Sequence, residues 1–87
     1  MAEDDKKFSR QLIGKTIVSK TGKRFGEVGD ITFETKTGEL IHMVITNPTQ
    51  YSMKLELERD SGNNILIPFS ALIAIGDFMV IAEEDII

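Results

Sequence analysis

The stretch of residues 12–46 limits the fold more than any other part of the chain. It divides into three runs in which β-branched residues favour strands. Gly22 and Gly38 stand between the runs, where a tight hairpin turn needs a residue that accepts a positive φ. Three consecutive antiparallel strands are therefore predicted, over residues 15–19, 24–34 and 39–46.

The second of these strands contains two shifts in the phase of its apolar residues, from Phe25 to Val28 and from Val28 to Ile31. A glycine stands in each shift, Gly26 in the first and Gly29 in the second. Because side chains alternate between the two faces of a strand, each shift would turn the core face outward unless a bulge absorbs one residue. Two bulges bend a strand, which predicts a small, tightly curled barrel and not a flat sheet.

The second half of the chain adds three shorter predicted strands. Residues 53–58 alternate between apolar and charged side chains, which is the pattern of a half-buried antiparallel strand. Residues 65–67 are predicted to be a short buried strand that stops at Pro68, and residues 78–82 the last strand. Residues 69–75 are predicted to be one helical turn or an irregular connection. The expected fold is all-β, a small six-stranded antiparallel β-barrel with little helix.

Length and composition set further bounds on the protein. With 87 residues it is expected to form one domain over residues 9–83, between a disordered tail at residues 1–8 and a short tail at residues 84–87. No apolar run approaches the roughly 20 residues that a membrane span requires. The acidic N-terminus does not resemble a signal peptide, so a cytoplasmic protein is expected.

The chain offers little for catalysis or metal binding. It has no cysteine, which excludes disulfides and thiolate metal sites. His42 is its single histidine, so a metal site built from histidine alone is excluded as well. No paired general acid and base and no activated nucleophile are visible. The expectation is therefore a protein without enzymatic activity and without a cofactor.

The strand over residues 39–46 supplies the first candidate for a binding surface, because it is largely apolar on both faces. One face would hold Ile41, Met43 and Ile45, and the other Leu40, His42 and Val44. The second face needs a cover, either the C-terminal segment or another subunit. Leu40, His42 and Val44 are therefore the candidate interface residues.

A run of bases without acids supplies a second candidate. Between Lys6 and Gly26 there are seven basic residues and no acidic one. One interpretation is a solvated edge that stays charged to discourage pairing between sheets. The other is a patch for an anionic partner such as RNA, and its residues would be Lys15, Lys20, Lys23 and Arg24.

The motifs of the chain, taken in order, resemble those of the PRC-barrel domain family. In the first half they are Ile13-Gly14-Lys15, Ile17-Val18, Thr21-Gly22-Lys23, Gly26-Glu27-Val28, Asp30-Ile31 and Thr37-Gly38. In the second half they are Ile67-Pro68-Phe69-Ser70-Ala71-Leu72, Ile75-Gly76-Asp77 and Val80-Ile81. Their order and spacing extend the resemblance over nearly all of residues 12–82, although residues 49–63 carry no family motif.

The resemblance implies a six-stranded barrel with a non-enzymatic role in binding other proteins. Members include a domain of the photosynthetic reaction-centre H subunit and the C-terminal domain of the ribosome maturation factor RimM. Free-standing versions are typical of archaea, and some resemble adaptors of the division machinery that bind the SepF-type membrane anchor of FtsZ, often as dimers. This chain has neither the extra domain of RimM nor the membrane helix of the H subunit. It is therefore expected to be a homodimeric adaptor with a protein partner and no membrane insertion, and the alternative is a module for RNA processing or ribosome maturation.

Overall fold

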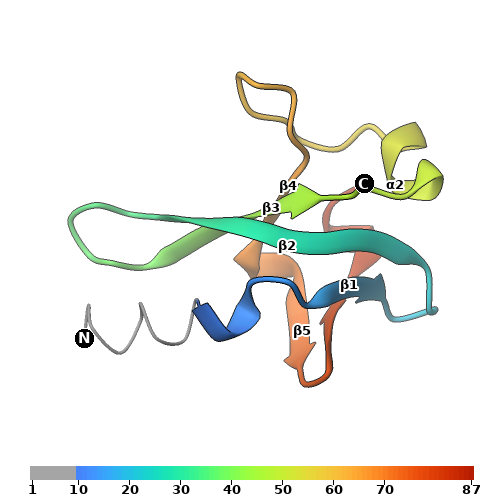
Figure 1. Ribbon diagram of the computed structural model, residues 1–87, viewed down its shortest axis with the longest axis horizontal. Coiled ribbons are helices and arrows are strands. Elements are labelled where there is room, and N and C mark those ends of the chain that lie inside the picture. Colours follow the sequence, from blue (N-terminus) through green and yellow to red (C-terminus); the bar gives the residue numbers. More distant parts are fainter. Residues whose placement is uncertain (1–9) are drawn as a thin grey trace.

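The computed structural model describes residues 10–87, so the tail predicted at residues 1–8 lies outside the described residues. Six strands form one sheet: β1 (Thr16–Ser19), β2 (Arg24–Phe33), β3 (Leu40–Thr46), β4 (Leu66–Pro68), β5 (Leu72–Ile75) and β6 (Phe78–Ile81). Short helical elements lie between and after them: α2 (Gln50–Lys54), η1 (Phe69–Ala71) and η2 (Glu83–Asp85) (Figure 1). The prediction of a β-rich fold with six strands and little helix is confirmed.

The strands lie in the order β4-β3-β2-β1-β6-β5, and one pair departs from the antiparallel pattern. β1 and β6 run parallel, with Thr16 opposite Phe78 and Ser19 opposite Ile81. The prediction of a wholly antiparallel sheet is therefore wrong. The reason lies in η1, which carries the chain from β4 into β5 without reversing it, so that β6 returns beside β1 in the direction of β1.

The prediction of a closed barrel is also wrong, because β4 and β5 are the two edges of the sheet and do not pair with each other. The three residues of η1 join these edges directly. Two strands that run in the same direction need a crossover of a dozen or more residues before they can pair, and η1 is too short for that. Since so short a connection spans at most about 14 Å, the end of β4 lies near the start of β5, and the sheet curls but remains open.

The strand predicted over residues 53–58 is absent. Thr49 caps α2, because its side chain accepts a hydrogen bond from the Ser52 backbone N–H. The Ser52 hydroxyl is buried and donates to the Phe25 carbonyl oxygen at 2.8 Å, which holds α2 against β2. This local capping prevails over the alternating pattern that follows it. The sixth strand is instead β5, within the segment predicted to be a helical turn or an irregular connection, and η1 is the helical turn.

The two glycine-marked bulges predicted in β2 are confirmed. Between β1 and β2 the register shifts beside Gly26, where Phe25 is the extra residue, and between β2 and β3 it shifts at Gly29. Gly26 has a φ of 142°, which side chains of L-residues rarely allow. A Cβ on Gly26 would lie 2.6 Å from the Ile45 Cγ2 atom. Because the bulges restore the phase, Phe25 and Val28 are both completely buried.

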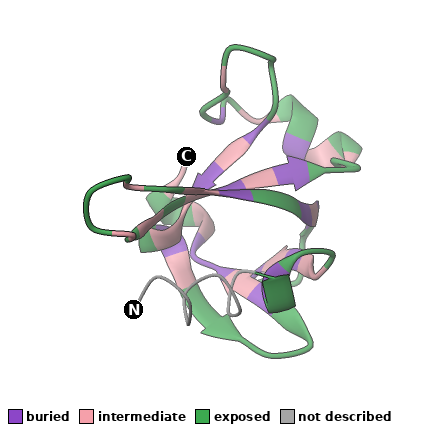
Figure 2. Cartoon of the chain, turned by 60° about the vertical axis from the view of Figure 1, so that its left-hand side comes forward, coloured by how far each residue is buried: buried purple, intermediate pink, exposed green. Residues whose placement is uncertain are grey.

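The hydrophobic core draws on five of the six strands and on the segments next to them. Its buried members are Leu12, Ile17, Phe25, Val28, Ile31, Met43, Ile45, Leu57, Ile65, Ile67, Met79 and Ile81. β5 contributes only the half-buried Leu72, and its remaining residues are exposed. In Figure 2 the buried residues alternate with others along the central strands, whereas β5 and the turn after it are largely exposed.

The turn predicted at residues 60–63 gives a first testable consequence. Asp60 Oδ1 accepts hydrogen bonds from the backbone N–H groups of Asn64 and Gly62, both at 2.9 Å. Hydrogen bonding by Asn64 is the main cause that lowers the pKa of the Asp60 carboxyl below its ordinary value of 3.8. A lowered pKa stabilises the folded protein above the ordinary value, and this contribution is lost as the pH falls through the folded value.

We therefore expect the variant Asp60→Ala to unfold at a lower urea concentration than the wild type at pH 7. The difference between the two midpoints should narrow as the pH falls through the lowered pKa of the Asp60 carboxyl, because the carboxyl then becomes protonated. Equilibrium urea unfolding over a series of pH values from neutral to acidic measures the difference between the midpoints. A difference of the same size at every pH would show that the charge of Asp60 has no part in stability.

Candidate functional site

The predicted interface residues Leu40, His42 and Val44 are all half-buried in β3. The prediction that they share one face is wrong for Leu40, because a bulge at Ile41 separates it from His42 and Val44. In β4, Leu66 lies opposite Val44 and Pro68 lies opposite His42. Leu40 packs against the hydrophobic core. β4 therefore extends the face of His42 and Val44 sideways, whereas Leu40 is covered by the hydrophobic core of its own chain.

His42 is held by polar groups on both sides. Its Nε2 atom lies 3.3 Å from Glu58 Oε1, and its backbone N–H donates to Thr32 Oγ1 at 3.1 Å. Thr32, His42 and Glu58 thus lie in the order of a nucleophile, a base and an acid. However, Thr32 Oγ1 is 3.5 Å from His42 Nδ1, which is longer than an activating hydrogen bond requires. The contacts with Glu58 and Thr32 hold the imidazole ring in place.

Leu40 and His42 also line a hollow beside η1, which we call the η1 hollow. Its volume is about 500 Å³, and its lining residues are Glu39, Leu40, Ile41, His42, Pro68, Phe69 and Ser70. Val44 is not among them. Of the candidate interface residues, the structure therefore brings Leu40 and His42 to one recess, and it adds the chain around η1, which lies in the second half of the sequence.

Ile41 is the residue of the η1 hollow that the sequence placed on the wrong side. It was expected on the same face as Met43 and Ile45, which are indeed buried, but 38% of Ile41 is exposed. The cause is a third register shift, between the pairs Thr32–His42 and Phe33–Leu40, in which Ile41 is the extra residue of β3. No glycine marks this shift, so the sequence carries no signal for it.

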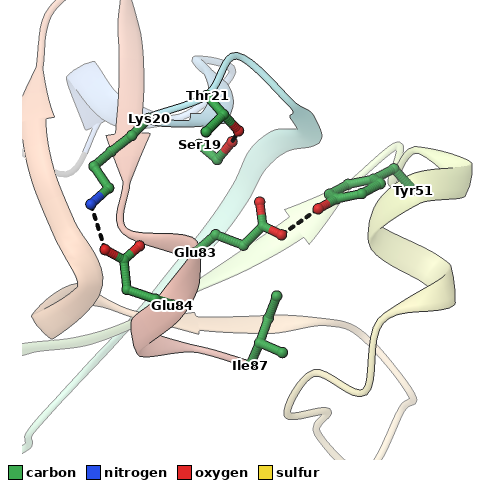
Figure 3. A pocket seen from close by; sticks show the side chains of 7 residues that line it. All are labelled: Ser19, Lys20, Thr21, Tyr51, Glu83, Glu84 and Ile87. Atoms are coloured by element: carbon green, nitrogen blue, oxygen red, sulfur yellow. Dashed lines mark hydrogen bonds and ion pairs between the residues drawn. The ribbon is translucent and has the colours of Figure 1, made fainter.

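A second hollow of about 510 Å³ lies among the turn after β1, α2 and the C-terminal residues (Figure 3). Its lining residues are Ser19, Lys20, Thr21, Tyr51, Glu83, Glu84 and Ile87. The Tyr51 hydroxyl donates to the Glu83 carboxylate, and Lys20 forms an ion pair with Glu84. The hydrogen bond between Lys20 and Glu84 raises the pKa of the lysine and lowers that of the glutamate. These contacts tie η2 to β1 and α2.

Comparison with known proteins identifies the family. A family model described as the PRC-barrel domain matches residues 4–85. This chain belongs to the PRC-barrel domain family. A relative, the uncharacterized protein MJ1118 of the archaeon Methanocaldococcus jannaschii, is 32% identical over 82 residues, which make up 94% of this chain and 88% of that protein. The resemblance drawn from the order of the motifs is confirmed, and the relative is consistent with a free-standing, single-domain PRC-barrel protein.

In this PRC-barrel protein the four bases of the alternative RNA patch are spread along β1 and the turn after it. They are Lys15, Lys20, Lys23 and Arg24. Lys15 lies at the start of β1, and the other three flank the turn beyond its end. Lys20 is paired with Glu84, and Lys23 Nζ lies 5.6 Å from the centroid of the Tyr51 ring. RNA binding by these residues stays a prediction.

Two further features of the PRC-barrel domain bear on its chemistry. Within residues 10–87, no helix has both the length and the apolar character needed to cross a membrane. In the same part of the chain, no three histidine, aspartate or glutamate side chains come together as ligands for a metal ion. Besides the basic residues, the surface features of the described residues that bear on function are the two hollows and the exposed apolar side chains.

Proposed function

We propose that this PRC-barrel domain is a non-catalytic adaptor that binds another protein at the η1 hollow. The observation that supports the proposal is the position of Ile41, an exposed apolar side chain pushed out by a bulge at the rim of a recess. Exposed apolar groups beside a recess, surrounded by polar ones, are typical of protein-binding surfaces. Here Glu39, His42 and Ser70 are the polar members, and Phe69 adds an aromatic ring.

The chemistry of the η1 hollow suits a peptide segment with an apolar anchor. Ile41 and Phe69 offer apolar contact, whereas Glu39 and Ser70 offer hydrogen-bond acceptors and a donor at the rim. The His42 ring contacts Glu58 through Nε2 at 3.3 Å and Thr32 through Nδ1 at 3.5 Å, so the ring is preoriented. A preoriented surface loses little side-chain entropy when a partner binds.

The partner that we propose is a SepF-type membrane anchor of FtsZ, which would make this protein a cell-division factor in the cytoplasm. The support for this partner is the resemblance to free-standing archaeal PRC-barrel adaptors, together with the relative from Methanocaldococcus jannaschii. Fold kinship supports this partner by analogy, so a direct binding measurement is the appropriate test.

The test is a calorimetric titration of the purified protein with a SepF-type anchor, which measures the dissociation constant. We expect the variant Ile41→Asp to bind at least about tenfold more weakly than the wild type, because it places a charge where an apolar side chain would be buried. The matched control is Met53→Asp, since Met53 is 50% exposed on α2, at the other end of β3 from the η1 hollow (Figure 1).

Each outcome of this titration bears on one part of the proposal. Equal affinities of wild type and Ile41→Asp would remove the η1 hollow as the binding site. An equal loss in Met53→Asp would point to a general effect of added charge. A wild-type protein that does not bind the anchor would leave this partner without support.

A further inference from the structure

The face of β3 that carries His42 and Val44 continues across the neighbouring strands. Pro68 of β4 lies opposite His42. Asp30 of β2 and Leu66 of β4 lie opposite Val44, one on each side. Side chains directly opposite in antiparallel strands lie on the same face of a sheet. Since His42 and Pro68 also line the η1 hollow, the hollow adjoins this face.

Apolar side chains extend from the η1 hollow across the adjoining face. Ile41 is 38% exposed at the hollow. Val44, Leu66, Pro68 and Phe69 are half-buried. A bound segment can therefore place an apolar anchor residue in the hollow and continue over β3 and β4.

The charged side chains beside these apolar ones are acidic. Glu39 lines the η1 hollow and is exposed, and Asp30 is exposed in the row of Val44. Glu58 Oε1 lies 3.3 Å from His42 Nε2, yet 58% of the Glu58 side chain remains exposed. All three carboxylates are therefore accessible as hydrogen-bond acceptors for a partner.

The basic side chains nearest to these acids have other neighbours. None of the described residues that line the hollow is a lysine or an arginine. Arg59 follows Glu58, but its guanidinium group donates to the Asn63 carbonyl oxygen at 3.2 Å. Lys36 lies in the turn before β3 beside Glu34, whose carboxylate accepts the Lys36 backbone N–H at 3.1 Å. The described surface around the hollow thus has a surplus of negative charge.

We propose that the η1 hollow binds a basic segment of the partner, in which an apolar anchor residue stands close to a lysine or an arginine. This inference rests on the proposed function, since it takes the hollow as the binding site, and it adds the charge of the segment that binds there. The anchor contacts Ile41 and Phe69, while the cation pairs with a carboxylate beside the hollow. Opposite charges across an interface speed the encounter and exclude partners of the wrong sign.

The strands set the spacing within such a segment. Glu39 precedes Ile41 by two residues, and Glu58 contacts His42, the residue after Ile41. Because an extended chain advances about 3.4 Å per residue, the basic residue is expected within about four positions of the apolar anchor.

A library of random peptides displayed on phage tests the charge of the segment without assuming a particular partner. Peptides retained by the immobilised wild type are depleted on the variant Ile41→Ser, which removes the apolar contact and leaves the charge of the protein unchanged. The remaining peptides depend on the hollow. We expect them to combine an apolar residue with a lysine or an arginine within about four positions.

The affinity of one such peptide is then measured for two variants with the same change of charge. Glu39→Lys should weaken binding at least about threefold, because it replaces an attraction by a repulsion. Asp77→Lys is the matched control, since Asp77 is exposed in the turn between β5 and β6, at the opposite edge of the sheet from β4. The chain has a net charge of -4, so the control measures how far any basic peptide is attracted in general. Binding to it should be nearly unchanged.

The possible failures of the inference and of the proposed function are distinguishable. Remaining peptides that are neutral or acidic would overturn the basic segment but leave the η1 hollow as a peptide-binding site. Equal losses in Glu39→Lys and Asp77→Lys would overturn it as well, because the charge of the whole chain would then be responsible. If no peptide distinguished the wild type from Ile41→Ser, the hollow would not be the site, and the proposed function would fail together with the inference. Far-ultraviolet circular dichroism checks that each variant remains folded.

Discussion

Replacing Gly26 by alanine is expected to lower the free energy of unfolding by about 2–6 kcal/mol, from backbone strain of about 1–3 and overpacking of about 1–3 kcal/mol. Gly26 has a φ of 142°, and a Cβ there would lie 2.6 Å from Ile45 Cγ2 and 3.0 Å from the Thr46 carbonyl oxygen. A domain of this size is stable by roughly 4–13 kcal/mol in total. The Gly26→Ala protein should therefore lose a large fraction of its stability, seen as lower midpoints of urea and thermal unfolding.

Alanine substitutions at two other glycines measure the cost of backbone strain separately from the cost of overpacking. Gly22 has a φ of 89°, and a Cβ there would have nothing within 4 Å of it, so Gly22→Ala should cost only the strain of the left-handed backbone. Gly76 has open space around it and no positive φ, so Gly76→Ala should leave the unfolding midpoint nearly unchanged. If Gly26→Ala cost no more than Gly22→Ala, the close approach to β3 would contribute nothing.

Truncating Phe25 to alanine is expected to destabilise the protein by about 3–5 kcal/mol, the range for a buried aromatic residue. Phe25 is completely buried, and its ring meets the Tyr51 ring edge to face, with 5.6 Å between the centroids. The substitution leaves a cavity between β2 and α2 and removes that aromatic contact. Urea unfolding, followed by the fluorescence of the single tyrosine, measures the loss.

The matched control for this truncation is Phe33→Ala, the same chemical change at the end of β2, at a side chain that is partly exposed. Its cost should be below about 1 kcal/mol, as for most surface substitutions. Similar losses in the two variants would mean that the bulge beside Gly26 does not direct Phe25 into the core.

The local features of the fold could be predicted because single residues determine them. Gly26 and Gly29 mark the bulges of β2, and the glycine-containing turns mark the hairpins. The parallel contact of β1 with β6 could not be predicted in this way. It depends on η1, which passes the chain from one edge to the other without a reversal, and no pattern within either strand indicates its partner.

Residues 53–58 show how a pattern can mislead. Their alternation of apolar and charged side chains is that of a strand, yet Met53 is exposed in α2 and Leu57 is buried in an irregular segment. The decisive contacts are the capping by Thr49 and the hydrogen bond from Ser52 to Phe25, which lies 27 residues away. The second of these depends on tertiary structure, so periodicity carries no trace of it.

Only the part of the candidate site that depends on a local sequence pattern could be predicted. Leu40 and His42 follow from the two-sided apolar pattern of β3, and both line the η1 hollow. Ile41 was placed in the core because nothing in the sequence marks the bulge that expels it. Phe69 joins the site through the pairing of β3 with β4, which brings η1 beside the start of β3.

The parallel contact between the first and the last strand has a consequence for the synthesis of this protein. One side of β1 stays without its neighbour until residues 78–81 have been made, since Thr16 meets Phe78 across 62 positions of the chain. Closing so long a loop is slow compared with forming the hairpins. Until residues 78–81 have been made, the nascent polypeptide presents β1 as a strand without one of its two neighbours, so the sheet is completed only after those residues and not hairpin by hairpin.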